Sequence, residues 1–308
     1  MKKIAAIFPG QGSQSFGMGE DFYNSSSLAK EMIDSASNRV GFDFKDLMFN
    51  KNDRLEQTEF TQPAIFLVSS IAHRLFENEM NIKPIFALGH SLGEFSALES
   101  VGALNYLDGV ELVHKRGNLM KSACKGVDVG MMAVIGLDDD KVEQLCTDAR
   151  DDGKKVWAAN YNSDGQIVVA GIKSDLGDMV DMFKGAGAKR AILLNMSIAS
   201  HCPLLDSVIS PLKIELEKYL KDDFISPVIS NVTGKKYDSK SQAVDLLAKQ
   251  LTMPVLYKQS IKEYQDEIDL FVEFGGGVLK GLNKRGVKKP TLSVVDMVSL
   301  EELYKELS

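Results

Sequence analysis

The chain has 308 residues, of which 44% are hydrophobic and 26% are charged, a composition typical of a globular protein with one large core and at most one smaller one. The formal net charge of −7 argues against nucleic acid as the main ligand, because a phosphate backbone requires a basic surface. No apolar run approaches the roughly 20 residues of a membrane span, so we expect no membrane segment.

Short apolar runs alternate with segments of helical period along the first part of the chain, which is the pattern of an α/β protein. The apolar run at residues 3–8 is too short for a secretory signal, and we expect it to be a buried first strand. The next expected elements are helix 61–77, strand 85–89, helix 92–100 and helix 108–123. Thr61 is the expected N-cap of its helix, with Pro63 in the first turn.

The middle of the chain, residues 127–196, is expected to form a small inserted subdomain. Its predicted elements are strand 131–135, helix 138–149, strand 156–159, a turn at 162–165, strand 166–170, helix 174–184 and strand 189–194. This β-α-β-β-α-β order is that of a ferredoxin-like unit. Residues 1–126 and 197–308 then make up the large subdomain, with later elements at helix 203–220, strand 227–230, helix 241–251, helix 255–265 and strand 270–273.

The pentapeptide GHSLG at residues 89–93 fits a nucleophile elbow, a tight strand-to-helix turn that presents a serine hydroxyl above a sheet. Glycine at positions 89 and 93 lets the backbone turn without side-chain clashes, and the following helix N-terminus favours negative charge. The bare pattern also occurs by chance, and Ser91 could instead be an N-cap in an ordinary turn. Because the flanking segments suit a strand and a helix, we favour a nucleophilic Ser91.

A nucleophilic serine requires a base, and the sequence offers four histidines. His73 lies within an apolar helix, His114 lies among charged residues on a helix, and the side chain of His90 should diverge from that of its neighbour Ser91. His201 follows an expected strand end and precedes a helix, a position where catalytic groups of α/β proteins gather. By elimination, His201 is the candidate base.

Two further features suggest a substrate pocket. The turn around Gln11 fails the nucleotide-binding glycine patterns, so it is either a plain turn or a source of backbone N–H donors for an oxyanion. Arg116 would usually be a surface residue, but inside a serine pocket its guanidinium would select a substrate with a carboxylate. Three scattered cysteines, with no Cys-x-x-Cys pair, favour a reduced cytoplasmic protein without a zinc site, and we expect neither a metal nor a cofactor.

Several separated motifs resemble the malonyl-CoA:acyl carrier protein transacylase family of bacterial fatty acid synthesis, which also supplies acyltransferase domains of polyketide synthases. These motifs occur in order along nearly the whole chain: FPGQGSQ at 8–14, TQPA at 61–64, GHSLGE at 89–94, KRG at 115–117, NYNS at 160–163, GQ at 165–166, SHC at 200–202, SNVTG at 230–234 and QL at 250–251. Each motif is weak alone, but the ordered set is specific.

The resemblance implies an α/β-hydrolase-like large subdomain interrupted by the ferredoxin-like one, with the active site between them. It implies that Ser91 carries the acyl group, that His201 is the general base, and that the main-chain carbonyl of Gln250 orients this histidine. The other implied site residues are Gln11 and Leu92 as backbone oxyanion donors, Arg116 as the partner of the malonyl carboxylate, and Met120 and Asn160 in the pocket wall.

The implied reaction moves a malonyl group from malonyl-CoA to the phosphopantetheine thiol of acyl carrier protein, with the coenzyme A thioester as substrate. An acidic carrier protein needs a basic landing site, for which the candidates are Lys189, Arg190, Lys284 and Arg285, unless these are ordinary solvated charges. Two other functions stay open: a serine esterase or thioesterase on the same elbow, and a non-catalytic carrier-binding subunit. The choice between a malonyl and a methylmalonyl group stays open.

Overall fold

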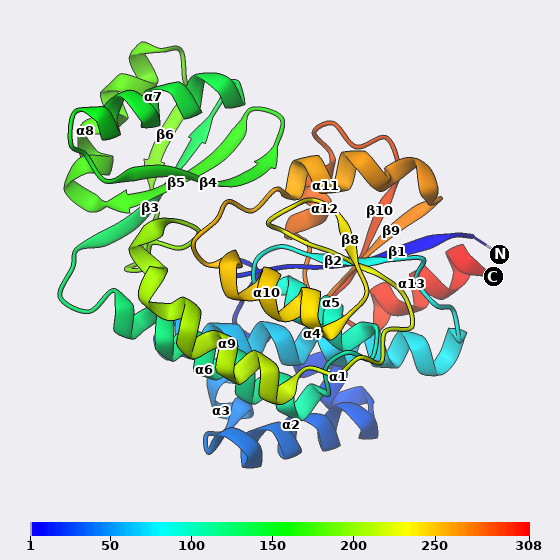
Figure 1. Cartoon of the computed structure of the whole chain (residues 1–308). Helices are drawn as coiled ribbons and strands as arrows, with labels where there is room; N and C mark the ends of the chain where they lie inside the picture. The colour runs from blue at the N-terminus through cyan, green and yellow to red at the C-terminus, as the bar shows by residue number, and fades with distance from the viewer. Residues whose placement is uncertain (1) are drawn as a thin grey trace.

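The computed structural model describes residues 2–308, and in this range the chain folds around two β-sheets with helices packed against them. Figure 1 shows the smaller sheet with two helices at the upper left, set apart from the larger helical and sheet region, and the two termini close together. The predicted α/β fold class is confirmed. Among these residues, we find no helix that combines the length and apolar character needed to cross a membrane.

The larger sheet has six strands in the order β10-β9-β1-β2-β7-β8. Its strands are β1 (Ile4–Phe8), β2 (Ala87–Gly89), β7 (Val228–Ile229), β9 (Leu270–Phe274), β10 (Thr291–Val294) and the antiparallel β8 (Lys236–Tyr237). Side chains of β1 alternate between two hydrophobic clusters, one on each face of the sheet. This burial on both faces explains why the strand is apolar at every position, as in parallel sheets covered by helices.

Helices cover both faces of the larger sheet. On one face the core includes α4 (Thr58–Met80) and α5 (Gly93–Ser100), and on the other it includes α11 (Tyr257–Tyr264) and α12 (Val278–Asn283). The remaining helices of this region are α1 (Glu20–Ser25), α2 (Ser27–Val40), α3 (Phe44–Phe49), α6 (Tyr106–Ala123), α9 (Ile209–Tyr219), α10 (Lys240–Gln250) and α13 (Met297–Leu307), with short 3₁₀ turns at Arg54–Glu56, Pro203–Val208 and Gln265–Glu267. No element was predicted for α1, α2, α3, α12, α13, β8 or β10.

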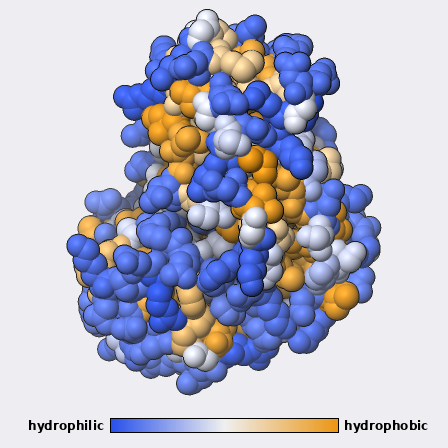
Figure 2. All heavy atoms as spheres, turned by 90° about the vertical axis from the view of Figure 1, so that its left-hand side faces the viewer, coloured by the Kyte–Doolittle hydropathy of each residue, from blue (hydrophilic) through white to orange (hydrophobic). Residues whose placement is uncertain are grey.

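The smaller sheet is antiparallel, with the order β4-β5-β3-β6. It comprises β3 (Val129–Ile135), α7 (Asp139–Asp151), β4 (Val156–Ser163), β5 (Gln166–Ile172), α8 (Lys173–Gly185) and β6 (Arg190–Leu193). This is the β-α-β-β-α-β element order predicted for the inserted segment, although the exact boundaries of the two subdomains stay a prediction. Figure 2 shows apolar side chains on the upper part and along its junction with the rest of the molecule.

Three predicted elements were wrong in detail. Helix α4 begins at Thr58, so Thr61 is not an N-cap; its hydroxyl donates to the carbonyls of Leu55 and Gln57. The predicted turn at 162–165 is shorter, because β4 continues to Ser163. The predicted helix 203–220 is divided into a 3₁₀ turn and α9, which begins at Ile209.

Proline lies inside α4 because a side chain from another helix compensates for its missing N–H. Pro63 cannot donate to the carbonyl of Glu59, four residues earlier, as a helix normally requires. That carbonyl instead accepts a 2.7 Å hydrogen bond from Nδ1–H of His114 on α6. His114, predicted to lie on a solvated face, is therefore half-buried and joins α6 to α4.

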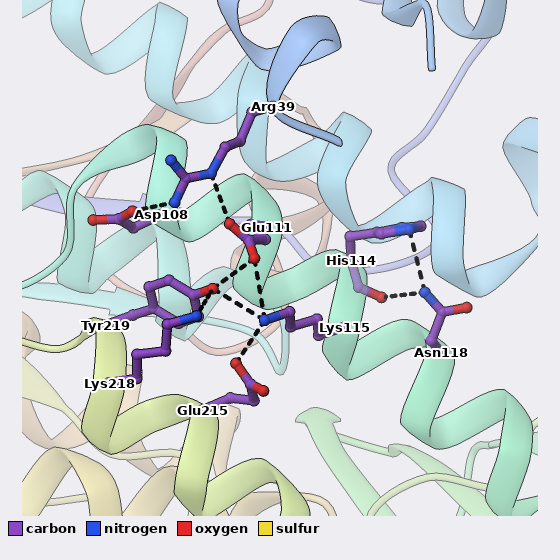
Figure 3. A network of polar contacts seen from close by, with 9 residues as sticks. All are labelled: Arg39, Asp108, Glu111, His114, Lys115, Asn118, Glu215, Lys218 and Tyr219. Atoms are coloured by element: carbon purple, nitrogen blue, oxygen red, sulfur yellow. Dashed lines mark hydrogen bonds and ion pairs between the residues drawn. The ribbon is translucent and has the colours of Figure 1, made fainter. Parts of the chain in front are cut away.

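Helix α6 is also held by a polar network on its other sides (Figure 3). Arg39 on α2 donates to Asp108 and Glu111 of α6, each at 2.7 Å. Lys115 of α6 donates to Glu215 of α9 at 2.8 Å, and Lys115 and Lys218 both donate to the hydroxyl of Tyr219. Within α6, Asn118 donates to the carbonyl of His114 at 3.0 Å. The ion pairs of Arg39 and Lys115 join α6 to α2 on one side and to α9 on the other.

Candidate active site

Ser91 lies at the turn between β2 and α5, with a left-handed backbone conformation at φ 51°. This conformation is unusual for a residue with a side chain and is typical of a functional turn under strain. A Cβ atom on Gly93 would lie 2.0 Å from the carbonyl oxygen of Phe8, and one on Gly89 would lie 1.8 Å from the backbone of Gly93. Both glycines of the predicted elbow are therefore required by close backbone packing.

His201 is hydrogen-bonded to Ser91. The distance from Nε2 of His201 to Oγ of Ser91 is 2.8 Å, and Nδ1 lies 2.7 Å from the main-chain carbonyl oxygen of Gln250. Because a carbonyl only accepts, the proton of the neutral ring is assigned to Nδ1, which leaves the lone pair of Nε2 facing the serine hydroxyl. The structure thus brings together the predicted nucleophile, base and orienting carbonyl.

The imidazole of His201 is neutral in this environment. Burial and the neighbouring Arg116 cation lower the pKa of His201 to about 3, although the carbonyl of Gln250 opposes this shift. His201 also has a left-handed backbone, at φ 63°, and its N–H donates to the carbonyl of Leu251 at 2.7 Å. It lies in a loop several residues after β6, not directly at the end of a strand as predicted.

Arg116 is buried and lies beside Ser91, contrary to the usual surface position of an arginine. It is 1% exposed, and its guanidinium donates to Oε1 of Gln62 at 2.6 Å, to Oγ of Ser91 at 3.1 Å and to Oε1 of Gln250 at 3.0 Å. Its Nε–H has no partner among the described residues. Burial lowers the pKa of Arg116, but a guanidinium stays charged in proteins. A permanent cation with unused donors therefore lies next to the nucleophile.

The two predicted oxyanion donors, Gln11 and Leu92, line the same cavity as Ser91. Neither backbone N–H donates a hydrogen bond to any group in residues 2–308. The side chain of Gln11 accepts a hydrogen bond from Thr58 at 2.9 Å, which holds the loop against α4. Two free N–H groups beside a nucleophile are what an oxyanion hole requires.

The cavity has a volume of about 250 Å³ and lies between the two sheets. Ser91, His201, Arg116, Met120 and Asn160 all line it, so the structure places both predicted pocket-wall residues there. The other lining residues are Gln62, His90, Met131, Ala133, Asn162, Gln166, Val168, Leu194, Met196, Ile198 and Ser200. A wider groove of about 670 Å³ shares Gln11, Met196 and Ile198 with it and opens past Lys121 and Lys125.

The other two histidines have structural contacts. Nε2 of His90 lies 2.7 Å from Oδ1 of Asn162, so the elbow is joined to β4 of the smaller sheet. His73 is 2% exposed, and its ring packs against Phe8 and Phe274. Neither is hydrogen-bonded to the Ser91 side chain within residues 2–308, in agreement with the choice of His201.

The four predicted docking residues are exposed on the surface. The backbone of Lys189 is bonded to Ile135 beside the β4–β5 turn, and Arg285 reaches Gln166 on the other side of that turn at 3.5 Å. Lys284 and Arg190 are exposed next to these residues. Both basic pairs therefore lie near the β4–β5 turn, at one end of the smaller sheet.

Sequence reasoning missed three buried residues that hold the site: Gln62, Glu94 and Asn231. Gln62 bonds Arg116, and Oδ1 of Asn231 accepts the backbone N–H of Ser91 at 2.6 Å. Glu94 lies one helical turn after Ser91 and accepts a hydrogen bond from Gln250 at 2.8 Å. All three occur in the motifs that carry the resemblance, which was the available signal. Within residues 2–308, no group of three or more potential metal ligands was found.

Comparisons with known proteins agree on one family. The acyl transferase domain family matches residues 6–282. A malonyl CoA-acyl carrier protein transacylase of Staphylococcus aureus (strain MRSA252) is 38% identical over 304 residues, 97% of this chain and 98% of that protein. The crystal structure of a malonyl-CoA:acyl carrier protein transacylase from Helicobacter pylori has a TM-score of 0.97 and 46% identity, covering 100% of this chain and 99% of that one. A malonyl-transacylase solved in complex with its type II PKS acyl-carrier protein has a TM-score of 0.94 and 32% identity, covering 99% of each chain.

Proposed function

Because the chain belongs to the malonyl-CoA:acyl carrier protein transacylase family, we propose that it transfers a malonyl group from malonyl-CoA to the phosphopantetheine thiol of acyl carrier protein. One observation carries the proposal: the hydroxyl of Ser91 contacts both the neutral ring of His201 and the cation of Arg116 in one cavity. A nucleophile and base suit acyl transfer, and the adjacent cation suits an acyl group that ends in a carboxylate.

The first half-reaction forms a malonyl-serine ester. Nε2 of His201 takes the proton of the Ser91 hydroxyl while Oγ attacks the thioester carbon, and the resulting oxyanion accepts hydrogen bonds from the N–H groups of Gln11 and Leu92. The carbon–sulfur bond then breaks, and the leaving thiolate takes the proton from His201. Coenzyme A leaves as its thiol, and no cofactor takes part.

The second half-reaction reverses these steps with another thiol. The phosphopantetheine thiol of the carrier protein gives its proton to His201 and attacks the ester carbon, after which Oγ of Ser91 leaves and regains the proton. A thiol leaves or attacks without strong general-base assistance. The neutral carbonyl of Gln250 is therefore a sufficient partner for His201, and an acidic third residue is not required.

Substrate binding also tunes the base in this proposal. The Arg116 cation is one of the causes that lower the pKa of His201. When the malonyl carboxylate pairs with Arg116, the two charges largely cancel, so the pKa of His201 rises and the imidazole becomes a better proton acceptor. An acetyl group has no carboxylate and cannot produce this effect. The acyl group thus helps to activate the histidine that transfers it.

The surroundings of the cavity suit the rest of the substrate and the partner. The cavity of about 250 Å³ is small enough to favour a short acyl group, with Met120, Ile198 and Ser200 in its wall. In the wider groove, Lys125 offers positive charge for phosphates of the incoming arm, whereas Lys121 is paired with Glu59. The basic pairs at Lys189–Arg190 and Lys284–Arg285 are proposed to bind the acidic carrier protein, and a cytoplasmic location is part of the same proposal.

The test is transfer from radiolabelled malonyl-CoA to carrier protein with and without its phosphopantetheine arm. The proposal predicts label on the holo-protein only, and none with the Ser91→Ala variant. Methylmalonyl-CoA and acetyl-CoA, added as competitors, measure the acyl preference. Rapid hydrolysis of malonyl-CoA, unaffected by carrier protein, would show a thioesterase instead. Label on neither the carrier protein nor free malonate would contradict the proposed activity.

A further inference from the structure

Glu94 is a fully buried acid in the first turn of α5, three residues after Ser91. Its carboxylate accepts hydrogen bonds from three groups: the backbone N–H of Asn231 at 3.1 Å, Nε2 of Gln250 at 2.8 Å, and the hydroxyl of Tyr237 at 3.0 Å. The reaction proposed above gives this acid no role. Burial raises the pKa of Glu94 to about 7, and the hydrogen bonds from Gln250, Asn231 and Tyr237 and the Arg116 cation oppose this rise. All three hydrogen-bond partners donate to the carboxylate, which is the pattern that suits its ionised form. A buried acid is costly unless its partners satisfy it, so its position at the elbow requires an explanation.

Through Gln250, Glu94 acts on three groups of the site. The side-chain Nε2 of Gln250 also donates to the carbonyl oxygen of Ser91 at 2.9 Å, and its Oε1 accepts from Arg116 at 3.0 Å. Its main-chain carbonyl accepts from His201. The amide cannot be reversed, because its NH₂ would then face the guanidinium and its oxygen would face two oxygens. Glu94 therefore helps to hold a side-chain amide that contacts the Ser91 carbonyl and the Arg116 guanidinium, in the residue whose main-chain carbonyl binds His201.

Through Asn231, Glu94 also acts on the elbow itself. The side chain of Asn231 accepts the N–H of Ser91 and donates to the carbonyl of Gly89, both at 2.6 Å. These bonds hold the turn in which Ser91 has its left-handed backbone. The backbone N–H of Asn231 is in turn fixed by Glu94. One carboxylate thus joins both side chains that hold the nucleophile.

Glu94 also carries charge next to a cation that lacks an ion pair. Arg116 has three neutral hydrogen-bond acceptors and, within residues 2–308, no carboxylate oxygen within 4.0 Å. Glu94 is the acid that acts on it electrostatically, and Gln250 lies between them with its oxygen toward Arg116 and its NH₂ toward Glu94. A buried cation requires such compensation in the absence of substrate.

We propose that Glu94 is a positioning residue of the transfer site, a role that rests on the proposed malonyl transfer. Its ionised carboxylate holds Gln250 and Asn231 in place and balances the charge of Arg116 until the malonyl carboxylate binds. Malonyl binding then adds a second negative charge beside Arg116. The charge of Glu94 weakens malonyl binding, while its hydrogen bonds keep Ser91 and His201 aligned for reaction.

The two parts of this role are separable by substitution. In Glu94→Gln, the amide oxygen would accept from Asn231 and Gln250, and the NH₂ would face the hydroxyl of Tyr237, which accepts in place of donating. This variant removes the charge and keeps the hydrogen bonds. In Glu94→Ala, the two N–H donors lose their acceptor. Glu99→Gln is the matched control, because Glu99 is a second buried acid of α5 that bonds Arg74 outside the cavity.

The experiment measures kcat and KM for malonyl-CoA and acetyl-CoA with wild type and the three variants. For Glu94→Gln we expect the KM for malonyl-CoA to fall by about three- to tenfold, because Arg116 attracts the carboxylate more strongly, with the KM for acetyl-CoA unchanged. For Glu94→Ala we expect kcat to fall by about 10²-fold with both substrates, because Ser91 and His201 lose their alignment. Glu99→Gln should leave both KM values unchanged.

Two results would overturn the role of Glu94. If Glu94→Gln leaves the KM for malonyl-CoA at the wild-type value, the charge does not act on Arg116. If Glu94→Ala folds and keeps the wild-type kcat, the carboxylate does not align the site. If Glu94→Ala fails to fold, the KM of Glu94→Gln for malonyl-CoA still shows whether the charge acts on Arg116. The kcat of Glu94→Gln, expected within about threefold of wild type, then shows whether the hydrogen bonds alone keep Ser91 and His201 aligned. A wild-type enzyme without malonyl transfer would instead contradict the proposed function.

Discussion

Replacing Arg116 by alanine removes the cation that contacts Ser91 and leaves the nucleophile, the base and the oxyanion donors in place. A guanidinium has five N–H donors, and Arg116 uses them for three hydrogen bonds, to Gln62, Ser91 and Gln250. Its Nε–H stays available, and the Nη2–H that contacts Ser91 is released once Oγ carries an acyl group; Nε and Nη2 lie on the same edge of the guanidinium. A malonyl carboxylate can therefore accept two hydrogen bonds from this side chain.

The expected loss follows from those two bonds. Charge-assisted hydrogen bonds contribute about 1.5–3 kcal/mol each, and removal of one partner from a buried ion pair costs about 3–5 kcal/mol. The lower part of this range, about 3–4 kcal/mol, corresponds to a decrease in kcat/KM for malonyl-CoA of roughly 10²–10³-fold. Acetyl-CoA has no carboxylate, so its transfer should be unchanged or faster.

The assay is the ratio of kcat/KM for malonyl-CoA to that for acetyl-CoA, measured with holo-acyl carrier protein as acceptor. Arg116→Lys is the matched control: it keeps the charge but loses the planar fork, and its ratio should lie between those of wild type and alanine. An equal decrease with both thioesters in Arg116→Ala would refute the carboxylate-binding role. Such a result would mean that Arg116 supports the structure of the site and not the choice of acyl group.

Other parts of the structure lead to further predictions. Burial lowers the pKa of His73 to about 4, below its unfolded value of 6.5. The contribution of the neutral His73 ring to the free energy of unfolding is therefore full above pH 6.5 and is lost as the pH falls toward 4. In urea unfolding, lowering the pH from 7 to 5 should destabilise His73→Leu by about 2 kcal/mol less than wild type. Gly93→Ala should lower Tm and abolish transfer, because its Cβ would lie 2.0 Å from the carbonyl of Phe8, and a variant with wild-type Tm and activity would contradict the elbow packing. Charge reversal at Lys284 and Arg285 should raise the KM for carrier protein but not for malonyl-CoA, and unchanged values for both would exclude this docking surface.

Local features of the site were predictable from the sequence. The elbow could be predicted because its requirements lie within five residues: two glycines at points of close backbone contact and a serine between a strand and a helix. The pairing of His201 with Ser91 could be chosen among four histidines because few positions suit a base. The order of strands and helices in the smaller sheet was also predictable, because each element has its own period of apolar residues.

Features that depend on distant residues were not predictable in this way. The beginning of α4 was placed too late because a proline normally belongs in the first turn, whereas here Pro63 is tolerated by a hydrogen bond from His114 on another helix. The orientation of Arg116 toward Ser91 depends on how α6 packs between α2 and α9. The link from Glu94 to Gln250 joins residues 156 positions apart, and no local pattern reports it.

The central claim is that Ser91 carries the malonyl group between two thiols. The most direct test is the intact mass of the protein after brief exposure to malonyl-CoA, followed by addition of holo-acyl carrier protein. We predict a mass increase of one malonyl group on wild type, its loss when carrier protein is added, and no increase on Ser91→Ala. An unmodified wild-type protein that still transfers malonyl, or a Ser91→Ala variant that gains the same mass, would contradict it.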